Sequence, residues 1–166
     1  MTDDQRLGGL IEAFVNRVSH PRGRVLNLMA RASVTVPQVI LLNFALTLPL
    51  STPSSLAAKM RMSLPSVSQM VDRLVKLKLV ARAEDPTDRR RKTVSVTAKG
   101  RSLLARLSAV RSAEYRAGAA GLSAAARARL IDALAEALRE LGTPAAHSPV
   151  DQKAKALKAS AKTVAA

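Results

Sequence analysis

Two short helical patterns separated by one tight joint, and followed by a basic hairpin, constrain this chain more than any other feature. They occupy the stretch from Ser51 to Gly100. The first helix is expected to begin at Thr52-Pro53, and Ser63 is a favourable N-cap for the second. Alternating residues then predict two short strands, Val80 to Glu84 and Thr93 to Thr97. This order is typical of a winged helix-turn-helix, which places one helix in a DNA groove and a hairpin beside it.

The charge of the chain predicts a polyanionic partner. The chain has 166 residues and a formal net charge of +15. Most of the excess lies between Ser51 and Arg111, where 14 lysines and arginines accompany 4 acidic residues. Such an excess favours nucleic acid or an anionic membrane as the partner. Aromatic residues make up only 2% of the chain, which argues against proteins that stack single-stranded bases on aromatic side chains.

Several classes of protein are disfavoured by what the sequence lacks. It contains no cysteine, which excludes disulfides, cysteine-based zinc sites and thiol redox sensing. His20 and His147 are too few and too far apart to suggest a metal site, and we expect no cofactor. No glycine-rich phosphate loop occurs, and no acid or nucleophile motif accompanies His20, so we do not expect an enzyme. Since no apolar run reaches the length of a membrane span and no signal peptide is present, we expect a soluble, cytoplasmic protein.

Amphipathic helices are predicted on both sides of the central stretch. Apolar residues recur at helical spacing at Leu7, Leu10, Ile11, Phe14, Val15 and Val18, and again at Leu130, Leu134, Leu138 and Leu141 after the N-cap Ser123. The pattern leaves open whether the first helix is kinked at Pro21 or ends there. From Val39 to Leu48 almost every residue is apolar, which predicts a helix in the middle of the fold. The expected fold is therefore mainly α, with a small two-stranded β-hairpin as the wing.

Two short motifs give the central stretch a resemblance to a known family. They are Asp85-Pro86-Thr87-Asp88-Arg89-Arg90 in the hairpin loop and Thr97-Ala98-Lys99-Gly100 at the start of the following helix. They resemble the D-P-x-D-x-R wing and the T-x-K-G helix start of the MarR family of bacterial transcriptional regulators. Ser66 to Leu74 is similar to the recognition helix of that family, and Arg82 stands where an arginine commonly ends the first wing strand. The resemblance covers about Thr35 to Leu107.

The resemblance implies a homodimer on a palindromic DNA operator, acting as a sequence-specific regulator and as a repressor relieved by a small molecule. Residues 1–34 are then N-terminal dimerisation helices, 35–100 the winged helix-turn-helix lobe, and 101–142 C-terminal dimerisation helices. Residues 143–166 are rich in Ala, Lys, Ser and Thr, which predicts a disordered basic tail. Lys78 stands where the family usually has a helix-ending glycine. If the backbone there is left-handed, lysine costs about 1 kcal/mol relative to glycine.

The predicted DNA contacts lie on the second helix and in the wing. Backbone N–H groups at the start of the helix can bind a phosphate, and Gln69 and Arg73 can pair with bases or phosphates. Asp88 lies two residues before Arg90 and can hold its guanidinium in a pose that suits a narrow minor groove. The full predicted set is Ser63, Pro65, Ser66, Ser68, Gln69, Arg73, Lys76, Arg82, Asp88, Arg89, Arg90, Arg91 and Lys92.

The remaining predicted site is one for a small anionic or aromatic effector, of the kind that binds between the dimer helices and the DNA-binding lobe in the family. Arg17, His20 and Arg24, around the Pro21 break, are the candidate residues, although His20 also suits a capping or surface role. An alternative function stays open. The basic charge and the tail are also compatible with an architectural DNA-binding protein that has no sequence preference and no ligand response.

Overall fold

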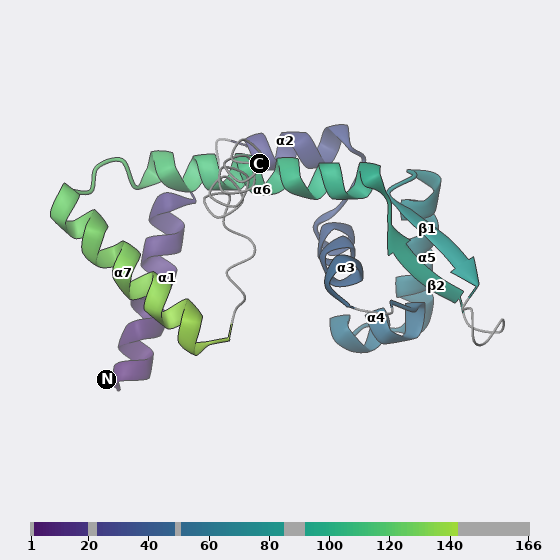
Figure 1. Cartoon of the computed structure of the whole chain (residues 1–166), viewed down its shortest axis with the longest axis horizontal. Helices are drawn as coiled ribbons and strands as arrows, with labels where there is room; N and C mark the ends of the chain where they lie inside the picture. Colours follow the sequence, from purple (N-terminus) through teal and green to yellow (C-terminus); the bar gives the residue numbers. More distant parts are fainter. Residues whose placement is uncertain (1, 20–22, 49–50, 85–91, 143–166) are drawn as a thin grey trace, which may run out of the picture. The chain divides into compact units, whose positions relative to one another are not determined.

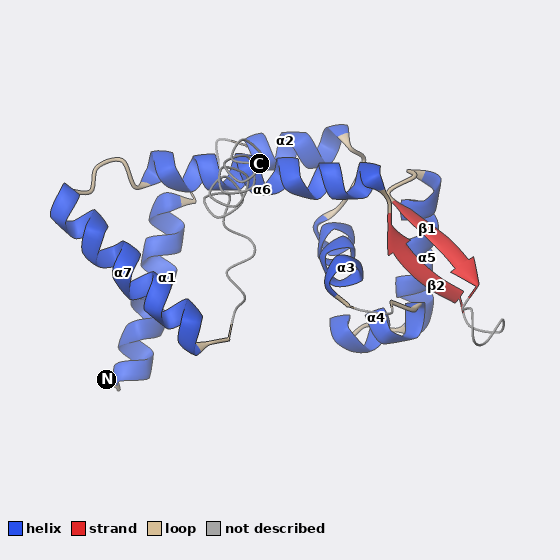
Figure 2. Cartoon of the chain, viewed as in Figure 1, coloured by secondary structure: helices blue, strands red, loops and turns tan. Residues whose placement is uncertain are grey.

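The computed structural model describes residues 2–19, 23–48, 51–84 and 92–142. It divides into two compact units, Met1–Arg116 and Ala117–Ala166, and each is described by itself. The described elements are mostly helices, with one antiparallel pair of strands (Figures 1 and 2). In chain order they are α1 (Asp3–Val18), α2 (Arg24–Arg31), α3 (Val36–Thr47), α4 (Pro53–Met60), α5 (Leu64–Lys76), β1 (Val80–Glu84), β2 (Lys92–Val96), α6 (Ala98–Gly118) and α7 (Ala124–Glu140).

The first predicted helix is followed by a separate second helix. Helix α1 begins with a capping box, in which Thr2 accepts from the N–H of Gln5 and the Gln5 side chain accepts from the N–H of Thr2. It ends at Val18, and Gly23 precedes α2 with a φ of 67°. Glycine adopts this left-handed backbone without steric cost, which allows the chain to start a new helix there. Of the two alternatives at Pro21, the split is the one observed.

Helix α3 lies at the centre of the first unit. The Gln38 side chain accepts from the N–H of Thr35, and Pro37 occupies the first turn, where a missing N–H has no cost. Leu41 and Leu42 are fully buried, as the nearly continuous apolar run predicted. Among the described residues no single helix is long and apolar enough to cross a membrane. Helices α2 and α3 pass that test only as a pair, and they are bent by 81° relative to each other.

A single apolar core holds the helix-turn-helix and the hairpin together. Its members from α3, α4, α5, both strands and α6 include Leu41, Leu56, Val71, Leu74, Val80, Val94 and Leu107. Each of these residues buries an apolar side chain away from water. Such burial stabilises a fold by about 1.5–3 kcal/mol per fully buried residue. The inward-facing residues of α4 and α5 include Leu56, Val67, Val71 and Leu74, which are fully buried.

The hairpin pairs Glu84 with Lys92 at its loop end and Val80 with Val96 at the opposite end, next to α5 and α6. The second strand therefore covers Lys92–Val96, one residue earlier than predicted. Thr97 is not part of the strand, because its hydroxyl caps the next helix. Its hydroxyl accepts from the N–H of Gly100 at 3.0 Å, which caps α6 as the sequence predicted.

Gly100 sets how closely α6 approaches the hairpin. A Cβ at this position would overlap the carbonyl oxygen of Leu79 and lie 2.7 Å from Cγ1 of Val96. The start of α6 therefore packs directly on the backbone that connects α5 to β1. This contact places α6 against the base of the wing.

The second unit contains α7. Ser123 caps this helix by accepting from the N–H of Ala126 at 3.2 Å, as predicted. None of its residues is buried, and Ile131, Leu134, Leu138 and Leu141 are exposed. Its apolar stripe is thus present but uncovered in the single chain.

Candidate nucleic-acid interface

Two serines form hydrogen bonds with each other at the start of α5. The Oγ of Ser63 accepts from the backbone N–H of Ser66, and the two hydroxyls lie 2.8 Å apart. Pro65 occupies the first turn, where it suits the helical backbone. Ser63 and Pro65 are exposed and Ser66 is half-buried. The N-terminal end of α5 is accordingly open to solvent, with the positive end of the helix dipole directed outward.

The two sides of α5 differ in the way a DNA-reading helix requires. Val67, Val71 and Leu74 face the core and are fully buried. Gln69, Arg73 and Lys76 are exposed and share the opposite side at a spacing of four and three residues. Ser68 is half-buried between the two sides. The exposed side carries one amide and two cations, which can bind base edges and phosphates in a major groove.

An ion pair joins α5 to the first wing strand. The Nη1 of Arg82 lies 2.5 Å from the Oδ1 of Asp72. Asp72 is exposed on α5 next to Arg73, and Arg82 is exposed in the middle of β1. Arg82 is one of the residues predicted to contact DNA, whereas no role was predicted for Asp72. In the structure Arg82 has a partner inside the protein, and this pair connects the strand to the helix.

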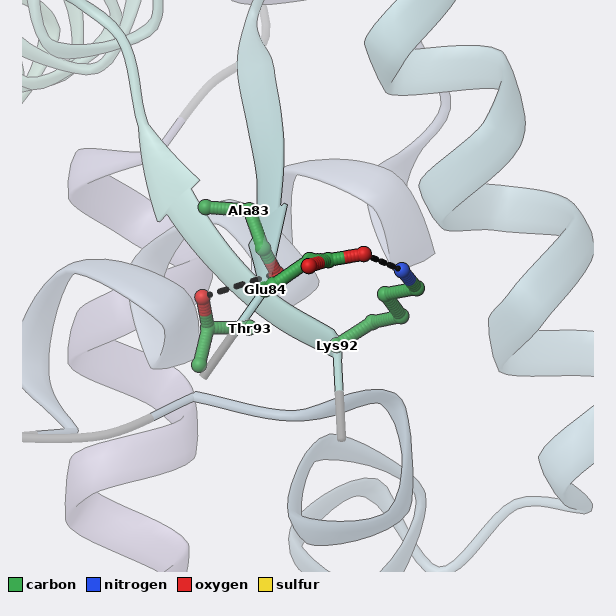
Figure 3. Close-up of polar contacts among 4 residues, drawn as sticks. All are labelled: Ala83, Glu84, Lys92 and Thr93. Carbon is green, nitrogen blue, oxygen red and sulfur yellow. Dashed lines mark hydrogen bonds and ion pairs between the residues drawn. The ribbon is translucent and has the colours of Figure 1, made fainter. Parts of the chain in front are cut away.

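A second ion pair lies at the loop end of the hairpin (Figure 3). The Nζ of Lys92 donates to Oε1 of Glu84 at 2.7 Å, and the hydroxyl of Thr93 donates to the carbonyl oxygen of Ala83 at 3.2 Å. The hydrogen bond and the charge of Lys92 both lower the pKa of Glu84 from its ordinary value. Lys92, predicted to bind phosphate, is therefore paired with Glu84 at the loop end of the hairpin. Asp88, Arg89, Arg90 and Arg91 lie outside the described residues.

The turn that follows α5 is held by α6. Lys78 has a φ of 59°, so the left-handed backbone considered from the sequence is present. Its carbonyl oxygen accepts from the Thr97 hydroxyl at 2.8 Å, and the Nζ of Lys99 donates to the carbonyl oxygen of Leu77 at 2.9 Å. These bonds fix the C-terminal end of α5 relative to the wing.

A groove lies between α2 and α6, which run side by side in Figure 1. It consists of two adjoining hollows of about 360 and 430 Å³ that share Leu28, Arg31 and Arg106. We call it the α2–α6 groove. Arg24 and Lys99 add two further cations to its lining, and none of the described lining residues is acidic. Of the predicted effector residues, Arg24 lines the groove, Arg17 is exposed in the last turn of α1 and is not among the lining residues, and His20 lies outside the described residues.

No cluster of three metal-binding side chains occurs in the part of the chain that the structure describes.

Known proteins resemble this chain in sequence and in fold. Residues 32–91 match the sequence model of the MarR family. Among solved structures, the transcriptional regulator Tm0710 from Thermotoga maritima is 19% identical with a TM-score of 0.70, over 82% of this chain and 94% of that one. The YusO protein from Bacillus subtilis is 22% identical with a TM-score of 0.63, over 84% and 99% of the two chains.

A third structure is that of a protein–DNA complex, of MepR from S. aureus. It is 21% identical to this chain, with a TM-score of 0.61, over 76% of this chain and 96% of that one. At these identities the likeness shows the fold. No protein of curated function matches the sequence.

Proposed function

We propose that this chain, a MarR-family winged-helix transcriptional regulator, binds a palindromic operator as a homodimer and represses transcription until a small anionic molecule releases it. In the proposed complex α5 enters the major groove and the wing reaches the adjacent minor groove. The predicted set of DNA contacts applies, and within this set Arg82 also pairs with Asp72 and Lys92 with Glu84.

The observation that supports DNA binding most directly is the exposed side of α5. Gln69, Arg73 and Lys76 are held outward by a fully buried side made of Val67, Val71 and Leu74. Because the buried side is held against the core, the three polar side chains project from one side of the helix, toward solvent. A fixed row of hydrogen-bonding groups is what base reading requires, whereas non-specific binding needs charge alone.

Two uncovered apolar faces support the homodimer. In α1, Leu7, Leu10 and Ile11 are exposed, and in α7 the exposed residues are Ile131, Leu134 and Leu138. A single soluble chain rarely leaves apolar stripes of this length in water, because their burial is favourable. A second copy of the chain would cover them by two-fold symmetry. A two-fold dimer in turn requires half-sites about 10 base pairs apart, one helical turn.

The α2–α6 groove supports the response to an effector. Its cations Arg24, Arg31, Lys99 and Arg106 surround a floor that includes Leu28 and Leu103. This lining suits a small molecule with a carboxylate and an apolar body. The groove lies against the start of α6, whose Gly100 and Lys99 contact the backbone that ends α5. A ligand there can shift α5 through α6.

Binding to DNA fragments upstream of the chain's own gene tests the proposal. We expect a footprint with two-fold symmetry that survives a large excess of unrelated duplex, at a stated salt concentration. An architectural DNA-binding protein would instead lose the fragment to competitor DNA in proportion to its amount. That result would contradict sequence-specific regulation and support the alternative, an architectural DNA-binding protein without sequence preference.

A further inference from the structure

Three helices in the first unit end with the same backbone arrangement. Among the described residues, Ser33, Arg61 and Lys78 have positive φ without being glycine, at 54°, 53° and 59°. Each follows a helix, and in each case the next residue donates its N–H to a carbonyl oxygen five positions earlier. This is the Schellman arrangement, in which glycine is the usual residue. The left-handed backbone therefore strains three side chains to a similar extent.

The turn at Arg61 differs from the other two in what it exposes. In the Schellman arrangement the residue after the left-handed one usually makes an apolar contact. Val34 and Leu79 do so and are 6% and 2% exposed, whereas Met62 is 39% exposed. The joint of the helix-turn-helix thus directs consecutive side chains, Arg61 and Met62, toward solvent.

Arg61 also differs from its neighbour Lys59, which has an aromatic partner. The Lys59 ammonium lies over the Phe44 ring, 5.9 Å from its centroid. The guanidinium of Arg61 makes no ion pair or hydrogen bond with any residue that the structure describes. It stands two positions before Ser63, whose hydroxyl caps α5. The exposed start of α5 therefore lies next to a cation that is unpaired among the described residues.

We propose that Arg61 contacts a DNA phosphate and so anchors the joint of the helix-turn-helix on the duplex backbone. This inference rests on the proposed function, in which the start of α5 approaches the major groove. A guanidinium next to the positive end of a helix dipole suits a phosphate oxygen, and a phosphate contact sets orientation without reading sequence. Arg61 adds to the predicted set a contact that lies outside both α5 and the wing.

Lys78 provides a matched control within the same chain. It is exposed, carries the same charge as Arg61 and has nearly the same φ, but it follows the other end of α5. Helix α5 has 13 residues, so the two cations are separated by a helix about 20 Å long. Replacement of either residue by glycine removes one charge and the backbone strain. Only one of the two replacements removes the proposed phosphate contact.

The experiment compares Arg61→Gly, Lys78→Gly and Arg61→Lys by thermal unfolding and by fluorescence anisotropy on a duplex at several salt concentrations. Both glycine variants should raise Tm by about 2–4 °C, since strain is relieved. Only Arg61→Gly should weaken binding, by about ten-fold, and reduce the slope of log Kobs against log salt by about 0.9 for each phosphate that the protein no longer neutralises. Arg61→Lys should keep the slope.

The slope separates a direct phosphate interaction from a general charge effect. Equal slopes for Arg61→Gly and Lys78→Gly would overturn the inference while leaving the proposed function in place, because the wild-type protein would still bind. If the wild-type protein bound no duplex, the proposed function would fail and the inference with it.

Discussion

The Nη1 of Arg82 lies 2.5 Å from the Oδ1 of Asp72, so an ion pair joins the middle of β1 to the exposed side of α5. Both side chains are partly exposed, and such a pair stabilises a fold by about 0.2–1 kcal/mol. Its larger effect is geometric. It connects the wing to the helix, and it neutralises a carboxylate that would otherwise stand beside Arg73 on the side proposed to face DNA.

This relationship predicts a partial rescue. Arg82→Ala should weaken DNA binding because it leaves the Asp72 carboxylate unpaired near phosphate. The double variant Asp72→Ala/Arg82→Ala should bind more tightly than Arg82→Ala alone, since the repelling charge is gone. Titration of the three variants against one duplex measures the difference. A double variant that binds no better than the single one would show that Arg82 itself contacts DNA, as its position in the sequence predicted.

The contact between α6 and the α5–β1 turn predicts an effect on stability. Gly100→Ala should lower the free energy of unfolding by about 1–3 kcal/mol, because the added methyl group overlaps the Leu79 carbonyl oxygen. Gly8→Ala is the control. It adds the same group in the exposed interior of α1, with no atom within 4 Å, and should stabilise by about 0.5–1 kcal/mol. Urea unfolding of both variants checks the opposite signs, and two equal changes would contradict the packing described for Gly100.

The exposed side of α5 predicts a loss of binding without a loss of stability. Arg73→Ala should weaken operator binding by about 1–3 kcal/mol, the usual range for a base contact. Since the Arg73 side chain is exposed, Tm should stay within about 1–2 °C of the wild-type value. Comparison of operator variants then separates two roles. A relaxed preference at one base pair indicates a base contact, whereas uniform weakening indicates a phosphate contact, and unchanged binding would remove Arg73 from the interface.

The ion pair at the loop end of the hairpin predicts how Glu84 titrates. Lys92 lowers the pKa of Glu84 below its ordinary value of 4.5, so the pair contributes to stability above that pH. The contribution is lost as the pH falls below 4.5 and through the lowered pKa, because protonation removes the carboxylate charge. In Lys92→Met the midpoint measured by NMR for the Glu84 carboxyl group should move up toward its ordinary value. A midpoint that is the same in both proteins would exclude the pair in solution.

Features determined by neighbouring residues were predictable from the sequence. The N-caps Thr52, Ser63 and Ser123 each act on an N–H three residues later, and the structure contains all three. The first wing strand was predicted correctly for the same reason, since alternation of residue types is a local property. The second strand was predicted one residue too late in the chain, because Thr97 could equally end a strand or cap a helix.

Features that depend on how distant segments meet were missed. Asp72 and Arg82 are ten residues apart, and only the return of β1 along α5 brings them together. The partner of Lys92 was missed because the register of the hairpin determines which residue faces it. In the α2–α6 groove, Arg24 was predicted from its place near Pro21, whereas Arg31, Lys99 and Arg106 come from segments up to 75 residues apart. No spacing rule connects them.

The α2–α6 groove predicts which arginine an effector requires. Benzoate, a small aromatic carboxylate, should bind to the protein, and Arg106→Ala should weaken that binding by about ten-fold, because Arg106 lines both hollows and charge-assisted hydrogen bonds contribute about 1.5 kcal/mol or more. Arg17→Ala is the control, since it removes the same charge from an exposed residue that is not among the groove's lining residues. Isothermal titration calorimetry measures both affinities. Equal weakening by the two substitutions would place the carboxylate outside the groove, and the absence of benzoate binding to the wild-type protein would exclude aromatic carboxylates of this size as effectors.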